Sequence, residues 1–547
     1  MEKMTLEELF EKVSMKLREP ISNVQSLFEW KTQMLTYINT IADLKCPISS
    51  STVQKNSSLD PSDWPSARKT AHEVLDSSLD YIESIRDRPA FIPIPDDVWT
   101  VLNDDPLPKR GQSLEQVCRD TFTYVVPYTF GNAHPRFLGW VGGEGTLGGA
   151  LADMIAATIN MSCGGFCHSG SLIERTVINW IRQMFGFPEA KNAGLIVSGT
   201  SMATLISIAT ARRKALGNIR QDGHVNGPQL VGYASTETHG CLVKAFELLG
   251  LGSKALHLIA VDDDFRMKID ELKVAMQEDR EKGLVPFCIV GNAGTVNTAA
   301  FDNLVELSVI CRAKNIWFHV DGAFGSLVIL DRERRHLVKG IERADSLAFD
   351  LHKWLHCPYD AGCVLIRESS HLQSTFAVHQ TYLTKTIRDF APDDLWFCDL
   401  GPELSRSFRA LKVWFTFKEH GIEKLGQKIA DNCEQAQYFA RLLEKHADII
   451  HVLRPITLNI VNFRVIPKEL DGDDHEVIDQ FNADLTQDVQ MSGVAIPSTS
   501  RIGNRLHIRI CVVSHRCVYE DFDSLAESLL KLTQQRIAKM KEAKNSK

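Results

Sequence analysis

An acid and an amine each follow a strand-like segment of this chain. The apolar run at residues 316–320 ends on Asp321, and the run at residues 346–349 is followed shortly by Lys353. Buried strands of parallel sheets have such compact apolar patterns, and the carboxyl ends of parallel strands meet at one sheet edge, where open α/β sheets bind ligands. We therefore expect Asp321 and Lys353 to share a cofactor site.

These two residue types indicate which cofactor binds. Pyridoxal phosphate bonds to a lysine through its aldehyde, and a carboxylate beside its ring nitrogen keeps that nitrogen protonated, so that the ring can accept electrons. Lys353 and Asp321 supply both groups. An aspartate at a strand end often caps a turn, and a lysine usually lies on the surface, so neither residue alone would indicate a cofactor. The prediction of a pyridoxal phosphate site depends on Asp321 and Lys353 occurring together.

A third segment predicts a phosphate site. Residues 195–197 are apolar and strand-like, residues 198–201 are small, and a helical pattern runs from there to Gly217. Free backbone N–H groups at a helix N-terminus, with the hydroxyls of Thr200 and Ser201, suit a cofactor phosphate. Serine and threonine are also common helix caps, so the order of this segment before Asp321 and Lys353 carries the prediction.

The elements that must position these residues follow a regular spacing. Strand-like runs begin near residues 195, 230, 256, 286, 316 and 346, roughly one βαβ unit apart, with helical stretches between them. This pattern predicts an α/β fold with a mostly parallel sheet that is covered by helices on both faces.

Composition describes an ordinary soluble protein. The 547 residues are 44% hydrophobic and 24% charged, and the net charge of −8 gives no positive field for nucleic acid or a membrane surface. Thirteen scattered cysteines argue against a disulfide framework or a metal site. The charged first residues lack a signal-peptide core, and no apolar run reaches membrane-span length. We expect a cytoplasmic protein without a metal.

The motifs HVDGAFG and DLHKW, with the lysine 32 residues after the aspartate, resemble the group II pyridoxal phosphate-dependent amino acid decarboxylases. This family includes aromatic L-amino acid, glutamate and cysteine sulfinate decarboxylases. The resemblance implies a fold type I, aspartate aminotransferase-like large domain. It also implies a ring-stacking role for His239 and further cofactor contacts from Asn292, Ala323 and His352.

The substrate side shows departures from the family. His134 begins the family motif HPRF, and Trp140 stands where aromatic amino acid decarboxylases carry a pocket aromatic. The other matching pocket positions hold Asn132, Ser162 and Gly164, which are smaller and more polar than the family's residues. These departures leave open whether the substrate is aromatic or acidic.

Asp350 is a departure beside the lysine. Animal aromatic amino acid decarboxylases have asparagine at this position, where it helps to hold the phosphate. A carboxylate near a dianion is repelled or protonated, so we expect Asp350 to turn away or to pair with a neighbouring cation. His352 would then take part of the phosphate contact.

A loop predicts the last catalytic residue and a homodimer. Periodicity fails between about residues 368 and 399, and a loop of this length inside a domain is usually functional or disordered. The family has a catalytic loop here that reaches the neighbouring subunit's site, with its tyrosine in the motif TYL, which Tyr382 matches. The resemblance therefore implies a homodimer with shared active sites.

We expect three regions: a helical N-terminal segment at residues 1–120 with a serine-rich linker near 48–63, a cofactor-binding large domain at 121–400, and a small α+β C-terminal domain at 401–547. The predicted activity is the α-decarboxylation of an L-amino acid, with an aromatic substrate preferred because of Trp140. The alternatives are decarboxylation of glutamate, aspartate or cysteine sulfinate, an aromatic aldehyde synthase, and an aminotransferase. A catalytically silent scaffold would lack a key residue, and none of them is missing.

Overall fold

The computed structural model describes residues 58–165, 167–189, 194–225, 227–378, 396–470, 472 and 474–545. The chain forms two compact units, Met1–Ala71 and His72–Lys547. In the first unit only residues 58–71 are described, and they include the start of helix α3 (Trp64–Glu83). The predicted boundaries near residues 120 and 400 stay predictions, as does the linker, of which only residues 58–63 are described.

The second unit contains a seven-stranded sheet in the order β1-β7-β6-β5-β4-β2-β3. The six predicted strands are confirmed, and neighbouring pairs among β2 to β6 are parallel. The seventh strand, β7, was not predicted, and it is antiparallel to both β1 and β6. The strand bounds are β1 Gly194–Val197, β2 Leu230–Ser235, β3 Leu256–Ile259, β4 Val285–Asn292, β5 Trp317–Asp321, β6 Ser346–Asp350 and β7 Gly362–Ile366.

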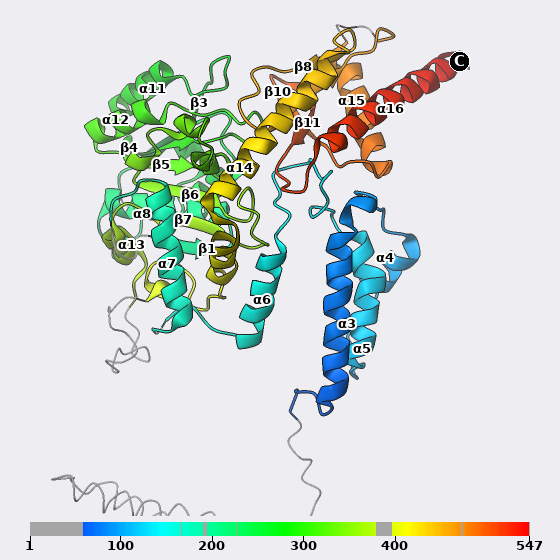
Figure 1. The fold of residues 1–547 in the computed structure, drawn as a ribbon. Coiled ribbons are helices and arrows are strands. Elements are labelled where there is room, and N and C mark those ends of the chain that lie inside the picture. Colours follow the sequence, from blue (N-terminus) through cyan, green and yellow to red (C-terminus); the bar gives the residue numbers. More distant parts are fainter. Residues whose placement is uncertain are drawn as a thin grey trace, which may run out of the picture. The chain divides into compact units, whose positions relative to one another are not determined.

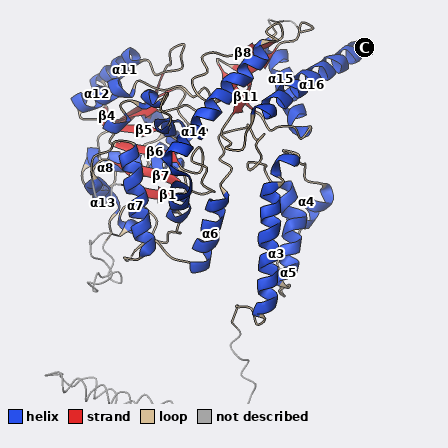
Figure 2. Ribbon diagram, in the orientation of Figure 1, coloured by secondary structure: helices blue, strands red, loops and turns tan. Residues whose placement is uncertain are grey.

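Helices cover both faces of this sheet (Figures 1 and 2). Successive residues of β4 point to opposite faces: Cys288 and Val290 belong to one apolar core, and Ile289 belongs to the other. This alternation is the period of a strand, and it makes a strand that is buried on both faces read as one continuous apolar run. The covering helices are α7 Ser169–Met184, α8 Thr200–Leu216, α10 Gly240–Leu248, α11 Ile269–Glu281, α12 Leu304–Lys314 and α13 Ser369–Phe376.

A second, antiparallel sheet follows in the order β10-β11-β9-β8. The long helix α14 (Ala410–Glu444) leads to it and is broken at Gly421, whose φ of 66° lies in the left-handed region that glycine tolerates. Its strands and helices are β8 Ile450–Val452, β9 Ile460–Val465, α15 His475–Met491, β10 Ser498–Ile502, β11 Arg505–Cys511 and α16 Tyr519–Asn545. The predicted mixture of helices and strands after residue 401 is present.

Three α-helices lie in the sequence between α3 and α7: α4 Asp96–Asn103, α5 Leu114–Asp120 and α6 Leu147–Ile159. Between α5 and α6, the glycine-rich segment packs against the main body. A side chain at Gly143 would lie 2.0 Å from the carbonyl oxygen of His352, so only glycine fits there. Within the described ranges, each helix is too short or too polar to be a membrane span.

Candidate active site

A cavity of about 590 Å³ lies at the carboxyl-terminal edge of the large sheet. Strands β4, β5 and β6 end on Asn292, Asp321 and Asp350, and all three residues line the cavity. Asn292 pairs directly with Asp321 in the parallel ladder. Lys353, three residues beyond β6, also lines the cavity, so the structure brings the predicted acid and amine together.

Asp321 is a buried carboxylate with one backbone donor. It is 5% exposed, and its Oδ1 accepts a hydrogen bond of 3.1 Å from the N–H of Ala323. Burial raises the pKa of Asp321, and the Ala323 N–H and the Lys353 ammonium offset only part of that rise. A protonated ring nitrogen beside this carboxylate would supply a positive charge that favours its ionised form and offsets the cost of burying it.

Lys353 forms a close ion pair with Asp350. Its Nζ lies 2.8 Å from Asp350 Oδ2. Burial lowers the pKa of Lys353, but Asp350 and the nearby Asp321 outweigh this effect, and the net shift is upward. Asp350 was expected to turn away or to pair with a neighbouring cation, and it pairs with Lys353, the predicted cofactor-binding lysine.

The N-terminus of α8 opens into the same cavity. Its N-cap is Gly199, which provides no side-chain cap, and Gly199, Thr200 and Ser201 all line the cavity. The Thr200 Oγ1 is buried and has no hydrogen-bond partner among the described residues. Buried hydroxyls are normally paired. A phosphate oxygen at this helix terminus would satisfy it.

Two histidines of the cavity have fixed orientations. His239 is the N-cap of α10, and its Nδ1 accepts from the Cys241 N–H at 3.2 Å, so capping and cavity lining coexist in one residue. The Nδ1 of His352 accepts from the Ala361 N–H at 3.0 Å, and its ring lies 4.2 Å from the Tyr359 ring. Burial lowers the pKa of His352, which keeps this imidazole neutral near pH 7.

The remaining predicted cofactor contacts also reach the cavity. Asn292 donates through Nδ2 to Ser235 Oγ at 3.0 Å and to Asp302 at 3.2 Å, which fixes its side chain, and Ala323 lies beside Asp321. Tyr382 lies outside the described residues. Among those residues, no cluster of three or more His, Cys, Asp or Glu side chains is arranged to hold a metal ion.

The predicted substrate residues separate into two groups. Trp140 lines the cavity. His134 does not: it is 1% exposed, and its ring nitrogens are held by the Arg136 N–H at 2.9 Å and the Arg88 carbonyl at 3.1 Å. Burial lowers the pKa of His134 to about 4, which marks it as a neutral histidine of the protein interior. Its predicted place in the substrate pocket has no support within this chain.

Ser162 and Gly164 also lie away from the cavity of their own chain. The Ser162 carbonyl accepts from His168 Nε2 at 3.0 Å. A side chain at Gly164 would lie 1.8 Å from the carbonyl oxygen of Leu404, so close backbone packing explains this glycine. The two positions stay predictions for a site that is shared between subunits.

Several cavity residues were missed because they come from distant parts of the sequence. Ser498, Thr499 and Arg509 reach the cavity from β10 and β11 of the second sheet. Arg509 is 3% exposed and donates to the carbonyls of Val296 and Trp140 at 2.7 and 2.9 Å. It therefore links the segments that contain Val296 and Trp140 at the cavity. The sequence around Arg509 contains no pattern that predicts this role.

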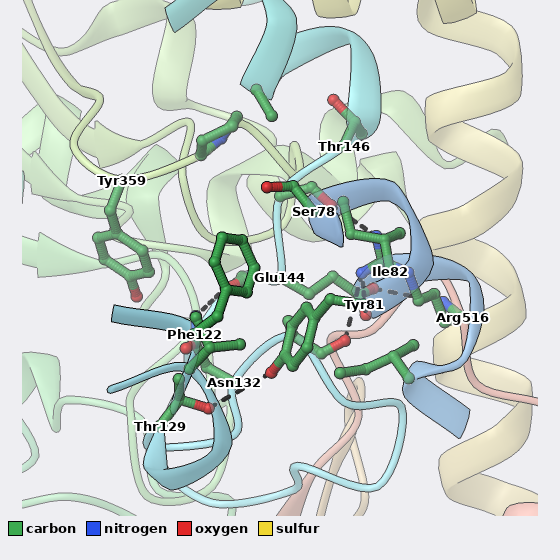
Figure 3. A pocket seen from close by; sticks show the side chains of 17 residues that line it. Ser78, Tyr81, Ile82, Phe122, Thr129, Asn132, Glu144, Thr146, Tyr359 and Arg516 are labelled. Atoms are coloured by element: carbon green, nitrogen blue, oxygen red, sulfur yellow. Dashed lines mark hydrogen bonds and ion pairs between the residues drawn. The ribbon is translucent and has the colours of Figure 1, made fainter. Parts of the chain in front are cut away.

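A second cavity of about 380 Å³ lies next to the first, and Tyr359 lines both. Figure 3 shows Tyr81, Ile82 and Phe122 around it, so much of its lining is aromatic or aliphatic. Asn132, a predicted pocket position, belongs to this cavity, and its Nδ2 donates to the Gly143 carbonyl at 3.0 Å. Apolar space is therefore available beside the cofactor site.

The residues present fit pyridoxal phosphate. The first cavity combines a lysine, a buried strand-end carboxylate and an unpaired buried hydroxyl at a helix N-terminus. Such a combination of an amine, a carboxylate that keeps the ring nitrogen protonated and an anion site is what this cofactor requires.

Comparisons with known proteins agree with this chemistry. Residues 95–466 match the pyridoxal-dependent decarboxylase conserved domain. The chain is 34% identical over 460 residues to an aromatic-L-amino-acid decarboxylase of Bacillus atrophaeus, a match that covers 83% of this chain and 92% of that protein. It is 32% identical over 399 residues to a histidine decarboxylase of Drosophila melanogaster, covering 70% of this chain and 46% of the fly protein.

The architecture is also similar to a solved structure. The crystal structure of Oryza sativa TDC with PLP and tryptamine superposes with a TM-score of 0.81 and 24% sequence identity, covering 88% of this chain and all of that chain. At this identity the likeness concerns the fold alone. It confirms the predicted fold type I α/β architecture.

Proposed function

Because this chain belongs to the pyridoxal-dependent decarboxylase family, and is therefore a pyridoxal phosphate-dependent amino acid decarboxylase, we propose that it converts an aromatic L-amino acid to the corresponding amine and carbon dioxide. The observation that carries the proposal is that Lys353, Asp321, His239 and the N-terminus of α8 all line one cavity. An aromatic-L-amino-acid decarboxylase as a relative at 34% identity supports the substrate class.

The proposed roles combine the lining of this cavity with the resemblance to the family. When bound, the cofactor supplies an aldehyde that bonds to the substrate amine and a ring that accepts the electron pair left when the bond to the carboxyl carbon breaks. Lys353 holds the cofactor until the substrate amine replaces it. Asp321 keeps a proton on the ring nitrogen, and Thr200 and Ser201 bind the phosphate. His239 would lie against the ring and hold it in place.

A proton must then reach the α-carbon in place of carbon dioxide. We assign this step to Tyr382, which matches the family motif TYL, with His239 as the group that can relay the proton. A tyrosine on a closing loop can donate a proton and exclude water at once. Donation by Tyr382 completes an overall reaction in which one proton replaces the carboxyl group.

The cavity supports an aromatic substrate over an acidic one. Among the described residues that line it, the cationic side chains are Lys353 and Arg509. Lys353 is needed for the cofactor, and Arg509 already donates to the Val296 and Trp140 carbonyls. Neither is free to pair with a second substrate carboxylate. Trp140 and the adjacent cavity lined by Tyr81, Ile82 and Phe122 suit an aromatic ring.

The experiment that tests this function is a carbon dioxide release screen. The purified protein is offered the twenty amino acids, DOPA, 5-hydroxytryptophan and cysteine sulfinate. We expect release from aromatic substrates, and release from acidic ones alone would refute the substrate class. The protein should also show the visible absorption band of lysine-bound cofactor, which Lys353→Ala should lose. A band that is unchanged in this variant would place the cofactor on another lysine.

We further propose a homodimer with shared sites. Helix α6 exposes Leu147, Met154, Ile155 and Ile159, which are spaced to share one helix face, and such an apolar stripe favours burial against another surface. Mixing inactive Lys353→Ala subunits with inactive Tyr382→Phe subunits should restore some decarboxylation. Hybrid dimers that form, as seen by pull-down of two tags, and yet stay inactive would place both residues in one chain's site.

The proposed compartment is the cytoplasm. The twelve described cysteines are all free, and nine of them are buried: Cys163, Cys241, Cys288, Cys311, Cys357, Cys363, Cys433, Cys511 and Cys517. Unpaired thiols in this number suit a reducing compartment. Fractionation of cells that express the full chain tests this, and recovery in a membrane or secreted fraction would refute it.

A further inference from the structure

Asp350 holds two of the groups that cofactor binding needs. Its Oδ1 accepts from the Thr200 N–H, the first amide of α8, at 2.6 Å. Its Oδ2 lies 2.8 Å from the Lys353 ammonium. The carboxylate therefore bridges the predicted phosphate site and the predicted cofactor-binding amine.

The fold keeps Asp350 in this position. It is the last residue of β6 and is 2% exposed; its N–H donates to the Ala323 carbonyl, and its backbone pairs with Gly362 of β7. A side chain at Gly362 would lie only 2.4 Å from Gly199 Cα, so the glycine lets the α8 N-terminus approach this strand end closely. The carboxylate has a helix terminus and an ammonium as partners, and leaving them would mean losing both.

A phosphate at the same helix terminus would meet this carboxylate. Both groups are anions that seek the same backbone donors, and like charges a few ångströms apart in a buried site repel strongly. His352, whose Nε2 is 3.8 Å from Asp350 Oδ2, adds little positive charge, because burial lowers its pKa and keeps it neutral. The phosphate site therefore contains an opposing charge as well as donors.

We propose that Asp350 is an affinity-limiting residue of the cofactor site: it competes with the cofactor phosphate for the N-terminus of α8 and so weakens phosphate binding. The inference rests on the proposed function, because it takes this helix terminus to be the phosphate site. The fraction of protein that carries cofactor would then depend on the free cofactor concentration.

The test separates the phosphate from the aldehyde. Pyridoxine 5′-phosphate carries the phosphate but no aldehyde to bond to lysine, whereas pyridoxal carries the aldehyde but no phosphate. Dissociation constants are measured by calorimetry for both ligands and for inorganic phosphate on the full chain, after cofactor removal. Asp350→Asn should bind pyridoxine 5′-phosphate and inorganic phosphate about tenfold more tightly, and pyridoxal affinity should change much less.

A matched control is Asp331→Asn. Asp331 is also 2% exposed, pairs with Arg334 at 2.9 Å and accepts from a backbone N–H, that of Glu333, at 2.9 Å, but it lies outside the cavity. This variant makes the same change in net charge and should leave all three dissociation constants unchanged. Circular dichroism checks the fold of each variant, and Asp350→Ser provides a second neutral replacement if Asp350→Asn does not fold.

Two outcomes would overturn the inference while leaving the proposed function intact. One is a wild-type protein that binds pyridoxine 5′-phosphate, with neutral variants at position 350 that bind it no better. The other is an equal gain for pyridoxal, which would show that Asp350 acts through Lys353 and not on the phosphate. A wild-type protein that binds neither pyridoxine 5′-phosphate nor pyridoxal would instead refute the proposed cofactor site.

Discussion

Removing one partner of the buried ion pair between Arg406 and Glu174 should be one of the most destabilising single substitutions in the second unit. Arg406 Nη2 lies 2.6 Å from Glu174 Oε1, and Nη1 lies 3.1 Å from Oε2. The two side chains are 3% and 1% exposed. Arg406 also donates to the carbonyls of Cys163 and Ile196, and Glu174 accepts from the Ile196 N–H, so the pair holds β1 just before the α8 N-terminus.

Arg406→Met removes the charge and keeps most of the side-chain volume. The change leaves Glu174 buried without its cation, and removing one partner of a buried pair costs about 3–5 kcal/mol. Burial lowers the pKa of Arg406, but Glu174 outweighs it and the net shift is upward, which agrees with a pair that favours the charged form. The double variant Arg406→Met/Glu174→Gln should recover part of the loss, because no bare charge remains.

Urea unfolding at one fixed cofactor concentration measures this effect, since ligand binding itself stabilises the fold. Arg332→Met is the matched control: its pair with Glu423 spans 3.1 Å, but the side chains are 83% and 84% exposed. We expect the control to change the free energy of unfolding by less than about 1 kcal/mol. An Arg406→Met effect that is no larger than the control would refute the argument from burial.

Three further predictions concern chemistry and pH. Asp321→Ala should retain detectable cofactor but lose several orders of magnitude in turnover, because the ring nitrogen loses its proton partner; near-normal turnover in a carbon dioxide release assay would contradict this. Burial lowers the pKa of His134 from 6.5 to about 4. Between these pH values the unfolded chain binds a proton at this histidine and the folded protein does not, so the free energy of unfolding falls by about 3 kcal/mol as the pH drops from 6.5 to 4. Urea unfolding should therefore show a flatter acid dependence for His134→Gln, and an equally steep one would count against a buried neutral histidine. Tyr382→Phe should shift products from amine towards aldehyde, ammonia and hydrogen peroxide, at the expense of oxygen and water, whereas amine as the sole product by mass spectrometry would remove Tyr382 from the proton-donor role.

The sequence by itself determined six of the seven strands of the large sheet and the meeting of Asp321 and Lys353 in one cavity. Six strands could be located because each is a compact apolar run at βαβ spacing, and parallel strands of this kind end at one edge. Asp321 and Lys353 follow two such strands directly, so their meeting depends only on neighbouring strands being parallel. The start of a helix at Thr200 was predictable for a similar reason, because a helix N-terminus is a local feature of the chain.

Tertiary structure decided what depends on distant segments. Strand β7 was missed because its short apolar run gives no sign of an antiparallel insertion between β1 and β6. Arg509 reaches the cavity from the second sheet, and His134 faces the protein interior, and neither placement follows from the local pattern around these residues. Local periodicity specifies which face of an element is buried. Contacts between residues far apart in the sequence depend instead on how the elements pack. The same packing brings Asp350 to the N-terminus of α8, 150 positions earlier in the chain.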